Sequence, residues 1–328
     1  MKKSHRSELI QFVKDDFPAA CGIYLFFNSA GCVIYVGKSV NIRNRVLDHL
    51  RHKKEEGFAW KGILSDDTSF IKHIVTNDEL MALVIEDKLI KIHKPLFNIR
   101  QKQYQKYKYL GITKGLFPGI KVYGHSLQTK NRFIFGPFKN RQHIELLLSI
   151  IQKYFRFRIC SEASPVSKCV YYDIELCMGP CTGKILPFAY TATVNDVVCF
   201  LNGNVNGLLH ELNKELKLCI NSLEFENAEK IRKMIEFCLA YTKKQYHHNL
   251  FKNKTIEIYN KVTGEVKYSF YHGRINFFTC KADKFLTDSG IIEHEHHPFF
   301  DPRILLDRSD IIYSWLNRHI SEFEYLFR

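Results

Sequence analysis

The 328-residue sequence lacks several features that would place it in a class of protein directly. No uninterrupted apolar run approaches the roughly 18 residues of a membrane-spanning helix, so no membrane is expected among its partners. The start MKKSHRSELIQFVKDD is basic but reaches Lys14, Asp15 and Asp16 before an apolar signal region can form. Internal repeats and low-complexity linkers are also lacking. We therefore expect a globular, cytoplasmic protein of two or three small domains.

Acidic residues are absent from one long stretch. Residues 88–144 contain thirteen lysines and arginines and no aspartate or glutamate, with aromatic residues interleaved among them. Lysines meet phosphates as point charges and aromatic rings stack on unpaired bases, so this stretch favours nucleic-acid binding without separating DNA from RNA. A solvated lysine-rich surface is the alternative interpretation. The candidate nucleic-acid contacts are Lys91, Lys94, Arg100, Lys102, Lys106 and Lys108.

The ten cysteines are expected as thiols or metal ligands, because a cytoplasmic chain does not favour disulfides. Four of them follow a C-x8-C-x7-C-x3-C pattern, at Cys160, Cys169, Cys177 and Cys181. Four thiolates in so short a segment indicate a structural metal site or an iron–sulfur cluster, and the spacing alone does not separate zinc from four irons. Four buried thiols without a metal are the alternative.

Periodicity predicts an α+β chain whose first domain spans residues 15–103. A β-hairpin is expected over 21–37, with Tyr24 directly opposite Tyr35. A helix from Asn41 to about residue 52, a strand at 69–75 and a helix from Asp78 to His93 follow. We expect a basic connector with the four cysteines at 104–185, built from short strands and a helix at 142–158. A helical hairpin is expected within 186–245, with helices at 203–222 and 225–244, and a region of unknown role at 246–328, with a last helix near 310–319.

Glu86 stands out on the second of these helices, because its neighbours three and four residues away are all apolar. They are Ala82, Leu83, Leu89 and Ile90. An unpaired carboxylate on an apolar surface is costly, so a cation is expected beside it: arginine, lysine or a metal. From these residues alone, a structural salt bridge explains Glu86 about as well as a functional site does.

Three motifs in order resemble a known family. Residues 22–24 (GIY) and 35–37 (YVG) resemble the two halves of the GIY-YIG nuclease signature. The segment GKSVNIRNRV at 37–46 is similar to the one that follows it in the UvrC excinuclease family, and LVIE…KPLFN at 83–98 matches that family's second signature. The motifs span about a hundred residues with the correct spacing, which leaves chance a minor alternative.

The resemblance implies metal-dependent hydrolysis of a DNA phosphodiester. Glu86 would hold one divalent cation, Mg²⁺ or Mn²⁺, by oxygen coordination that leaves waters in place. Tyr35 would orient or deprotonate the attacking water, which requires nearby cationic charge to lower its pKa from about 10. Arg45 would hydrogen-bond the scissile phosphate.

The remaining site residues implied by the resemblance support this chemistry. Tyr24, Lys38 and Asn98 would orient the phosphate and the groups around it. His49 occupies a position where many family members carry tyrosine, and either side chain can hydrogen-bond a phosphate or water. The cysteine pattern and its flanking FGPF and YFRFRIC segments also resemble the family, where a 4Fe–4S cluster is implied.

The helical hairpin carries LEFENAEKIR at 223–232, which resembles the UVR motif through which UvrC-type proteins bind the excinuclease protein UvrB. Phe225 is the expected anchor, with Glu226 and Arg232 at the rim; a plain structural hairpin is the alternative. Residues 246–328 are too few for the second nuclease of long UvrC proteins. The segments YVGKSVNIRNRVLDHLR at 35–51 and LIKIHKPLFN at 89–98 most resemble the short Cho branch, which makes only the 3′ incision. Cho is generally taken to lack a UVR motif.

These features imply a nuclease that incises damaged double-stranded DNA 3′ to a lesion, guided by UvrB after loading by UvrA. Two alternatives remain open on the sequence alone. One is a GIY-YIG nuclease that acts on branched DNA without excision partners. The other is a catalytically inactive adaptor that tethers DNA to UvrB.

Overall fold

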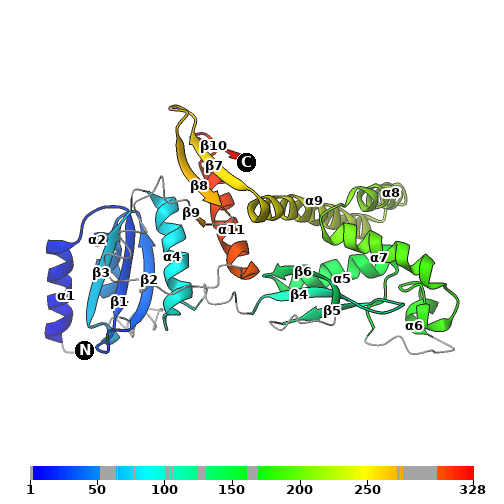
Figure 1. The fold of residues 1–328 in the computed structure, drawn as a ribbon, viewed down its shortest axis with the longest axis horizontal. Helices are drawn as coiled ribbons and strands as arrows, with labels where there is room; N and C mark the ends of the chain where they lie inside the picture. Colours follow the sequence, from blue (N-terminus) through cyan, green and yellow to red (C-terminus); the bar gives the residue numbers. More distant parts are fainter. Residues whose placement is uncertain are drawn as a thin grey trace. The chain divides into compact units, whose positions relative to one another are not determined.

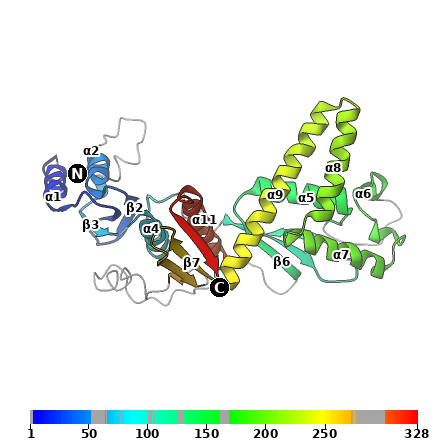
Figure 2. The same cartoon turned by 90° about the horizontal axis from the view of Figure 1, so that it is seen from above.

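The computed structural model forms two compact units, Met1–Tyr104 with Lys254–Arg328, and Gln105–Asn253. The structure describes residues 3–51, 64, 66–76, 78–99, 104, 106–124, 131–160, 169–271, 274–275 and 301–328. The first unit, here called the nuclease unit because it contains the residues that resemble the GIY-YIG nuclease signature, is discontinuous in sequence, with the second unit inserted between its two parts. Figures 1 and 2 give the elements of both units.

The N-terminal part of the nuclease unit is a three-stranded antiparallel sheet between helices. Its elements are α1 (Lys3–Asp16), β1 (Gly22–Phe27), β2 (Val33–Ser39), α2 (Ile42–Arg51), β3 (Phe70–Val75) and α4 (Glu79–His93). The strand order is β2-β1-β3. Helices α1 and α2 lie on one side of the sheet and α4 packs against β1 and β2 from the other (Figures 1 and 2). The central strand β1 is buried along its whole length, as a strand covered on both faces must be.

The C-terminal part of the nuclease unit is a second small sheet with one helix. Its elements are β7 (Thr255–Asn260), β8 (Val266–Tyr271), β9 (Arg274–Ile275), α11 (Pro302–Arg318) and β10 (Phe323–Phe327). The strands follow the order β10-β7-β8-β9. Helix α11 packs against α4. The residues expected as a separate C-terminal region therefore extend the nuclease unit.

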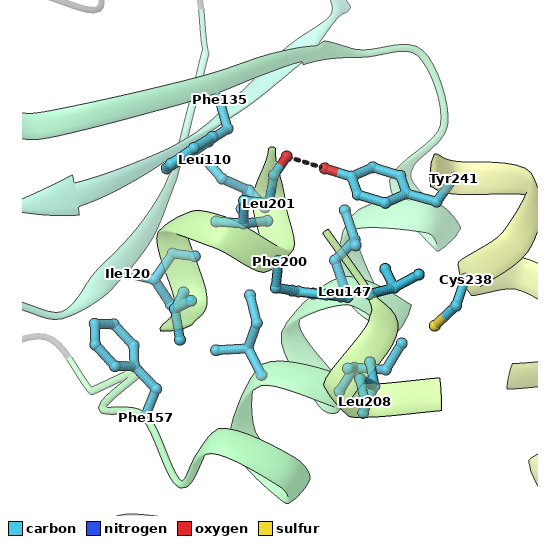
Figure 3. Close-up of a cluster of buried hydrophobic side chains, with 14 of the residues drawn as sticks. Leu110, Ile120, Phe135, Leu147, Phe157, Phe200, Leu201, Leu208, Cys238 and Tyr241 are labelled. Atoms are coloured by element: carbon cyan, nitrogen blue, oxygen red, sulfur yellow. Dashed lines mark hydrogen bonds between the residues drawn. The ribbon is translucent and has the colours of Figure 1, made fainter. Parts of the chain in front are cut away.

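The second unit combines a three-stranded sheet with a set of helices. Its elements are β4 (Lys108–Thr113), β5 (Ile120–Tyr123), β6 (Asn131–Phe138), α5 (Arg141–Phe155), α6 (Val170–Asp173), the 3-10 helix η2 (Pro180–Thr182), α7 (Pro187–Leu201), α8 (Asn206–Asn221) and α9 (Phe225–Asn253). The strand order is β5-β4-β6. One hydrophobic core joins this sheet to α5, α7, α8 and α9, and Figure 3 shows Leu110 of β4, Phe200 of α7 and Tyr241 of α9 within it. The Tyr241 hydroxyl donates to the Leu201 carbonyl at 2.6 Å. The connector and the helical hairpin, expected as two regions, therefore share a single core.

The α+β class is confirmed, and each helix expected near the site is present. The predicted register of the first hairpin is wrong. Tyr24 pairs with Gly37 and Tyr35 pairs with Phe26. The turn that Phe27 and Val33 close is one residue longer than expected, and an irregularity between Phe26 and Phe27 shifts the ladder by one residue more. The two tyrosine rings are diagonal neighbours, with centroids 6.1 Å apart. Among the described residues, no helix is both long and apolar enough to cross a membrane.

Candidate functional site

The candidate site gathers side chains from β1, β2 and α2. The Tyr24 hydroxyl lies 3.0 Å from Nε2 of His49, accepts a hydrogen bond from Arg45 and donates one to Tyr35. Asn41 starts α2 by accepting the backbone N–H of Asn44, as a helix N-cap does. The helix then carries Arg45 and His49 on one face, one turn apart. The expected grouping of the two tyrosines with Arg45 and His49 is thus present in the structure.

Gly37 is required by the packing of Tyr24. A Cβ atom at this position would lie 2.4 Å from the Tyr24 ring, which is closer than side-chain atoms approach one another. The glycine that ends the second half of the signature therefore makes room for the tyrosine of the first half. This is a packing reason for the residue type, independent of any family.

Glu86 faces this site from α4, in a setting that disfavours its charge. Burial raises the pKa of its carboxyl from 4.5 to about 7, which the nearby charge of Lys38 and a hydrogen bond from the Lys38 backbone N–H only partly oppose. Lys38 itself pairs with another carboxylate, because its Nζ donates to Oε1 of Glu79 at 2.6 Å. The cation expected beside Glu86 is therefore not fully supplied by the protein.

The two tyrosines hold their protons more tightly than free tyrosine does. Burial, followed by the charge of Glu86, raises the pKa of Tyr35. Burial and Tyr35 raise the pKa of Tyr24 well above its usual value of 10.0, although Arg45 opposes the change. The cationic environment that a tyrosine base needs is thus not provided by the protein side chains alone.

Asn98 is buried and fixes the backbone beside Tyr35. Its Oδ1 accepts the Val36 N–H at 2.9 Å, and its Nδ2 donates to the Val36 carbonyl at 2.7 Å. Phe97 continues the contact by donating to the Ile34 carbonyl at 3.0 Å. With both ends of its amide engaged, Asn98 acts on the site through strand β2, and the structure offers no free amide end for a phosphate.

The expected nucleic-acid contacts divide in two. Lys94, Lys106 and Lys108 are exposed, whereas Arg100 and Lys102 lie outside the described residues. The expectation for Lys91 is contradicted. Its side chain is 3% exposed, and its Nζ pairs with Asp87 at 2.6 Å and with Asp307 of α11 at 3.0 Å. A buried, doubly paired lysine cannot reach a phosphate, so Lys91 belongs to the α4–α11 contact.

The four clustered cysteines approach one another around η2. The other three each raise the pKa of Cys177 after the effect of burial, and Cys169 and Cys181 share a hydrogen bond. Donors reach two of the sulfurs: the Gly179 N–H lies 3.4 Å from Cys177, and the Arg158 guanidinium lies 3.7 Å from Cys160. Within the part of the chain that the structure describes, no group of three or more His, Cys, Asp or Glu is arranged to bind a metal. None of the nine cysteines described there forms a disulfide.

The tip of the helical hairpin is exposed and apolar. Leu223 and Phe225 are 71% and 65% exposed, and Leu223 adopts a left-handed backbone with φ of 60° that turns the chain between α8 and α9. Glu226 is exposed on the first turn of α9. Arg232 is paired with Glu229 at 2.7 Å and also with Glu236. The apolar tip is thus available to a partner, while Arg232 is engaged within its own helix.

Comparison with known proteins agrees with this geometry. Residues 20–99 match the family model of the UvrC-like GIY-YIG domain, which defines the class of the N-terminal part. Residues 107–200 match the model of the UvrC/Cho excinuclease middle domain. The chain belongs to the UvrC/Cho excinuclease family.

The chain matches individual relatives over only part of their length. UvrABC system protein C of Clostridium perfringens is 33% identical over 224 residues, which are 66% of this chain and 36% of that protein. The protein of the same name from Nitrosomonas europaea is 30% identical over 70% of this chain and 38% of its own length. The chain therefore spans little more than a third of these relatives. A solved structure of the GIY-YIG N-terminal endonuclease domain of UvrC from Thermotoga maritima, bound to magnesium as its catalytic divalent cation, is 27% identical. It covers 30% of this chain and 100% of its own, with a TM-score of 0.25.

Sequence reasoning missed Glu79, the partner of Lys38. A signal was present, because Glu79 precedes Glu86 by seven residues and two helical turns place both on one face of α4. It also missed every contact from α11, for which no local signal exists.

Proposed function

We propose that this chain is a divalent-metal-dependent endonuclease of nucleotide excision repair that incises damaged double-stranded DNA 3′ to the lesion. The observation that carries the proposal is the grouping of Tyr24, Tyr35, Arg45 and His49 opposite Glu86. Family membership supports the same activity. DNA as the substrate implies that the reaction takes place in the cytoplasm.

The residues around Glu86 fit a magnesium ion. Mg²⁺ is commonly held by one or two carboxylates together with substrate phosphates and waters, so a single buried glutamate is a suitable protein ligand. The raised pKa of Glu86 reflects a carboxylate with too little positive charge around it, which a divalent cation would correct. Mn²⁺ fits the same oxygen ligand. When bound, the ion would neutralise negative charge that develops on the phosphate during hydrolysis.

The side chains divide the remaining work. Arg45, exposed and next to Tyr24, donates hydrogen bonds to the scissile phosphate. Tyr35 keeps its proton in the free protein, so it orients the attacking water. To accept that water's proton it would first have to release its own proton to solvent, which neutralising the charge of Glu86 would favour. His49 holds Tyr24 in place through their 3.0 Å contact. Asn98 fixes β2, and with it the position of Tyr35.

Exposed lysines would supply DNA affinity. Lys94, Lys106 and Lys108 would pair with backbone phosphates, which gives binding that weakens steeply with salt. Arg100 and Lys102 stay in the proposed set on their sequence alone. These contacts position the duplex without reading its sequence.

Docking on UvrB would use the tip of the α8–α9 hairpin. An exposed phenylalanine beside an exposed leucine is an unusual surface for a protein in isolation, and aromatic anchors dominate many interfaces. Glu226 would lie at the rim. Loading of UvrB on damaged DNA by UvrA would precede this contact.

The cysteine cluster would hold a structural metal, either a 4Fe–4S cluster or zinc. Backbone and guanidinium donors directed at the sulfurs are the kind of contact that stabilises metal-bound thiolates. Metal binding would draw the four thiols together. Iron and sulfide in a brown, anaerobically purified protein would identify a cluster, one zinc in a colourless protein would identify a zinc site, and neither would leave buried thiols.

The experiment that tests the proposed activity maps nicks on a duplex with one site-specific lesion, with and without UvrA and UvrB. We expect one incision on the 3′ side that requires Mg²⁺ and the partners, and Glu86→Gln is expected to cut at less than roughly a hundredth of the wild-type rate. Nicking of branched DNA without partners would instead favour a structure-specific nuclease. Binding to UvrB and DNA without any cleavage would favour an adaptor.

A further inference from the structure

Lys38 lies between two carboxylates of α4. Its backbone N–H donates to Glu86, whereas its Nζ donates to Glu79 at 2.6 Å. Seven residues of α-helix place Glu79 and Glu86 about 10 Å apart on the same face. The side chain of Lys38 thus runs away from the carboxylate to which its own backbone is bound.

The pair of Lys38 and Glu79 is partly shielded from water and is linked to the C-terminal part of the nuclease unit. The two side chains are 29% and 22% exposed. Arg318, the last residue of α11, reaches the same Oε1 of Glu79 at 3.7 Å. Lys267 of β8 lies 3.3 Å from Asp78, which caps the N-terminus of α4 by accepting the Met81 N–H. Side chains of β8 and α11, in the C-terminal part of the unit, therefore contact the start of α4, which includes Glu79.

This arrangement matters because an ammonium group and a metal ion compete for the same carboxylate oxygens. Glu86 is a second acidic side chain on which the charge of Lys38 acts, so it is available to that ammonium group if Glu79 does not hold it. A lysine paired with Glu86 would satisfy that carboxylate and occupy the place of a divalent cation.

We propose that Glu79 is a positioning residue that holds the ammonium group of Lys38 away from Glu86 and so keeps Glu86 available to the divalent cation. Arg318 of α11 assists by pairing with Glu79. The inference rests on the proposed function, since it presupposes that Glu86 binds a metal. It adds a role for Glu79 and for the C-terminal part of the unit.

The test is a double-mutant cycle on metal binding, measured with Mn²⁺ alone and the full-length protein by electron paramagnetic resonance. Glu79→Gln is expected to weaken Mn²⁺ binding about tenfold when Lys38 is present, because the released lysine then pairs with Glu86. In a Lys38→Met background the same change is expected to have almost no effect. Asp48→Asn, which removes an exposed carboxylate on a different helix, α2, serves as the control for simple loss of negative charge.

The outcomes separate the possibilities. A similar weakening by Glu79→Gln in both backgrounds would reveal a general charge effect and overturn the proposal, as would unchanged binding in Glu79→Gln. If Mn²⁺ binding by wild type does not depend on Glu86, as judged by Glu86→Gln, the proposed metal site fails and this inference fails with it. Should Glu79→Gln fold poorly, Glu79→Ala in the same two backgrounds tests the same coupling.

Discussion

Glu86 is a carboxylate whose ionisation conflicts with its surroundings, and this has a consequence for stability. Burial raises its pKa from 4.5 to about 7, so the folded chain binds this proton more tightly than the unfolded chain does. The contribution to the free energy of unfolding is therefore fully present below pH 4.5 and is lost as the pH rises through about 7. The residue proposed to hold the divalent cation is thus expected to weaken the metal-free fold at high pH.

We predict that Glu86→Gln is more stable than wild type by about 1–3 kcal/mol at pH 8 in the presence of a chelator, because glutamine carries no charge to bury. Urea unfolding at pH 8 and at pH 4 measures the effect, and the difference should vanish at the lower pH. Equal stability of the two proteins at pH 8 would mean that the carboxylate is well solvated or already paired.

At this scale the sequence predicted most of the site's members and few of their contacts. The motifs located Tyr24, Tyr35, Arg45, His49 and Glu86. The opposition of the two tyrosines was wrong by two positions. A turn one residue longer than expected and a bulge each shift the register by one, and neither leaves a trace in a pattern of alternating residues. Asn98 was expected to orient the phosphate and the groups around it. Its hydrogen bonds are to backbone groups of Val36, and backbone partners carry no sequence signal.

The contact between α4 and α11 contains a buried group of charges. Lys91 lies between Asp87 and Asp307, and Arg308 approaches Asp87 at 3.7 Å. Two cations balance two carboxylates, so the group is stable only while it is complete.

Lys91→Met is expected to destabilise the nuclease unit by about 3 kcal/mol or more, since it removes the cation closest to Asp87 and Asp307 and leaves buried negative charge in excess. Thermal unfolding measures the loss. Lys94→Met, three residues later and exposed, is the matched control: it should leave stability unchanged and weaken DNA binding instead. The reverse pattern would mean that Lys91 contacts DNA after all.

The α8–α9 hairpin leads to a prediction about binding. Phe225→Ala should weaken association with UvrB by about 2 kcal/mol or more if the side chain is an interface anchor. Phe188→Ala, which removes another exposed phenylalanine of the same unit, controls for general loss of apolar surface. Unchanged affinity in a folded Phe225→Ala protein would assign docking to another surface, as the likeness to the Cho branch suggests.

Helix positions were largely predictable from sequence, and their ends less so. The cap at Asp78 and the stop before Pro95 predicted the two ends of α4 to within one residue. The last helix starts at Pro302, eight residues before the expected position, although Asp301 and Pro302 form a good start signal. Apolar periodicity identified that helix only where its buried face is regular.

At the scale of the whole molecule, a destabilising substitution in one unit should leave the other unit folded. Cys177→Ser is expected to destabilise the unit Gln105–Asn253 and to weaken DNA binding, while the nuclease unit stays folded, because the thiol lies in the second unit. Hydrogen exchange resolved by segment measures this, with the exposed Cys199→Ser as the control. Normal exchange and normal DNA binding in Cys177→Ser would argue against a structural metal.

The division into units was the least predictable feature. Composition and motifs separated a connector from a helical hairpin, yet both contribute to one core. They also left the residues after 246 unassigned, although these residues return to α4. Contacts between segments more than two hundred positions apart depend on tertiary packing, which periodicity within a short window does not record.

The discontinuity of the nuclease unit bears on how the chain is made. Synthesis proceeds from the N-terminus, and units fold as their residues leave the ribosome. The unit Gln105–Asn253 is complete once residue 253 has emerged, whereas α4 gains its partners Asp307, Arg308 and Arg318 only some fifty to sixty-five residues later. The proposed nuclease site is thus completed last, so a nascent chain would hold the proposed DNA-binding and docking surfaces before the contacts that support that site have formed.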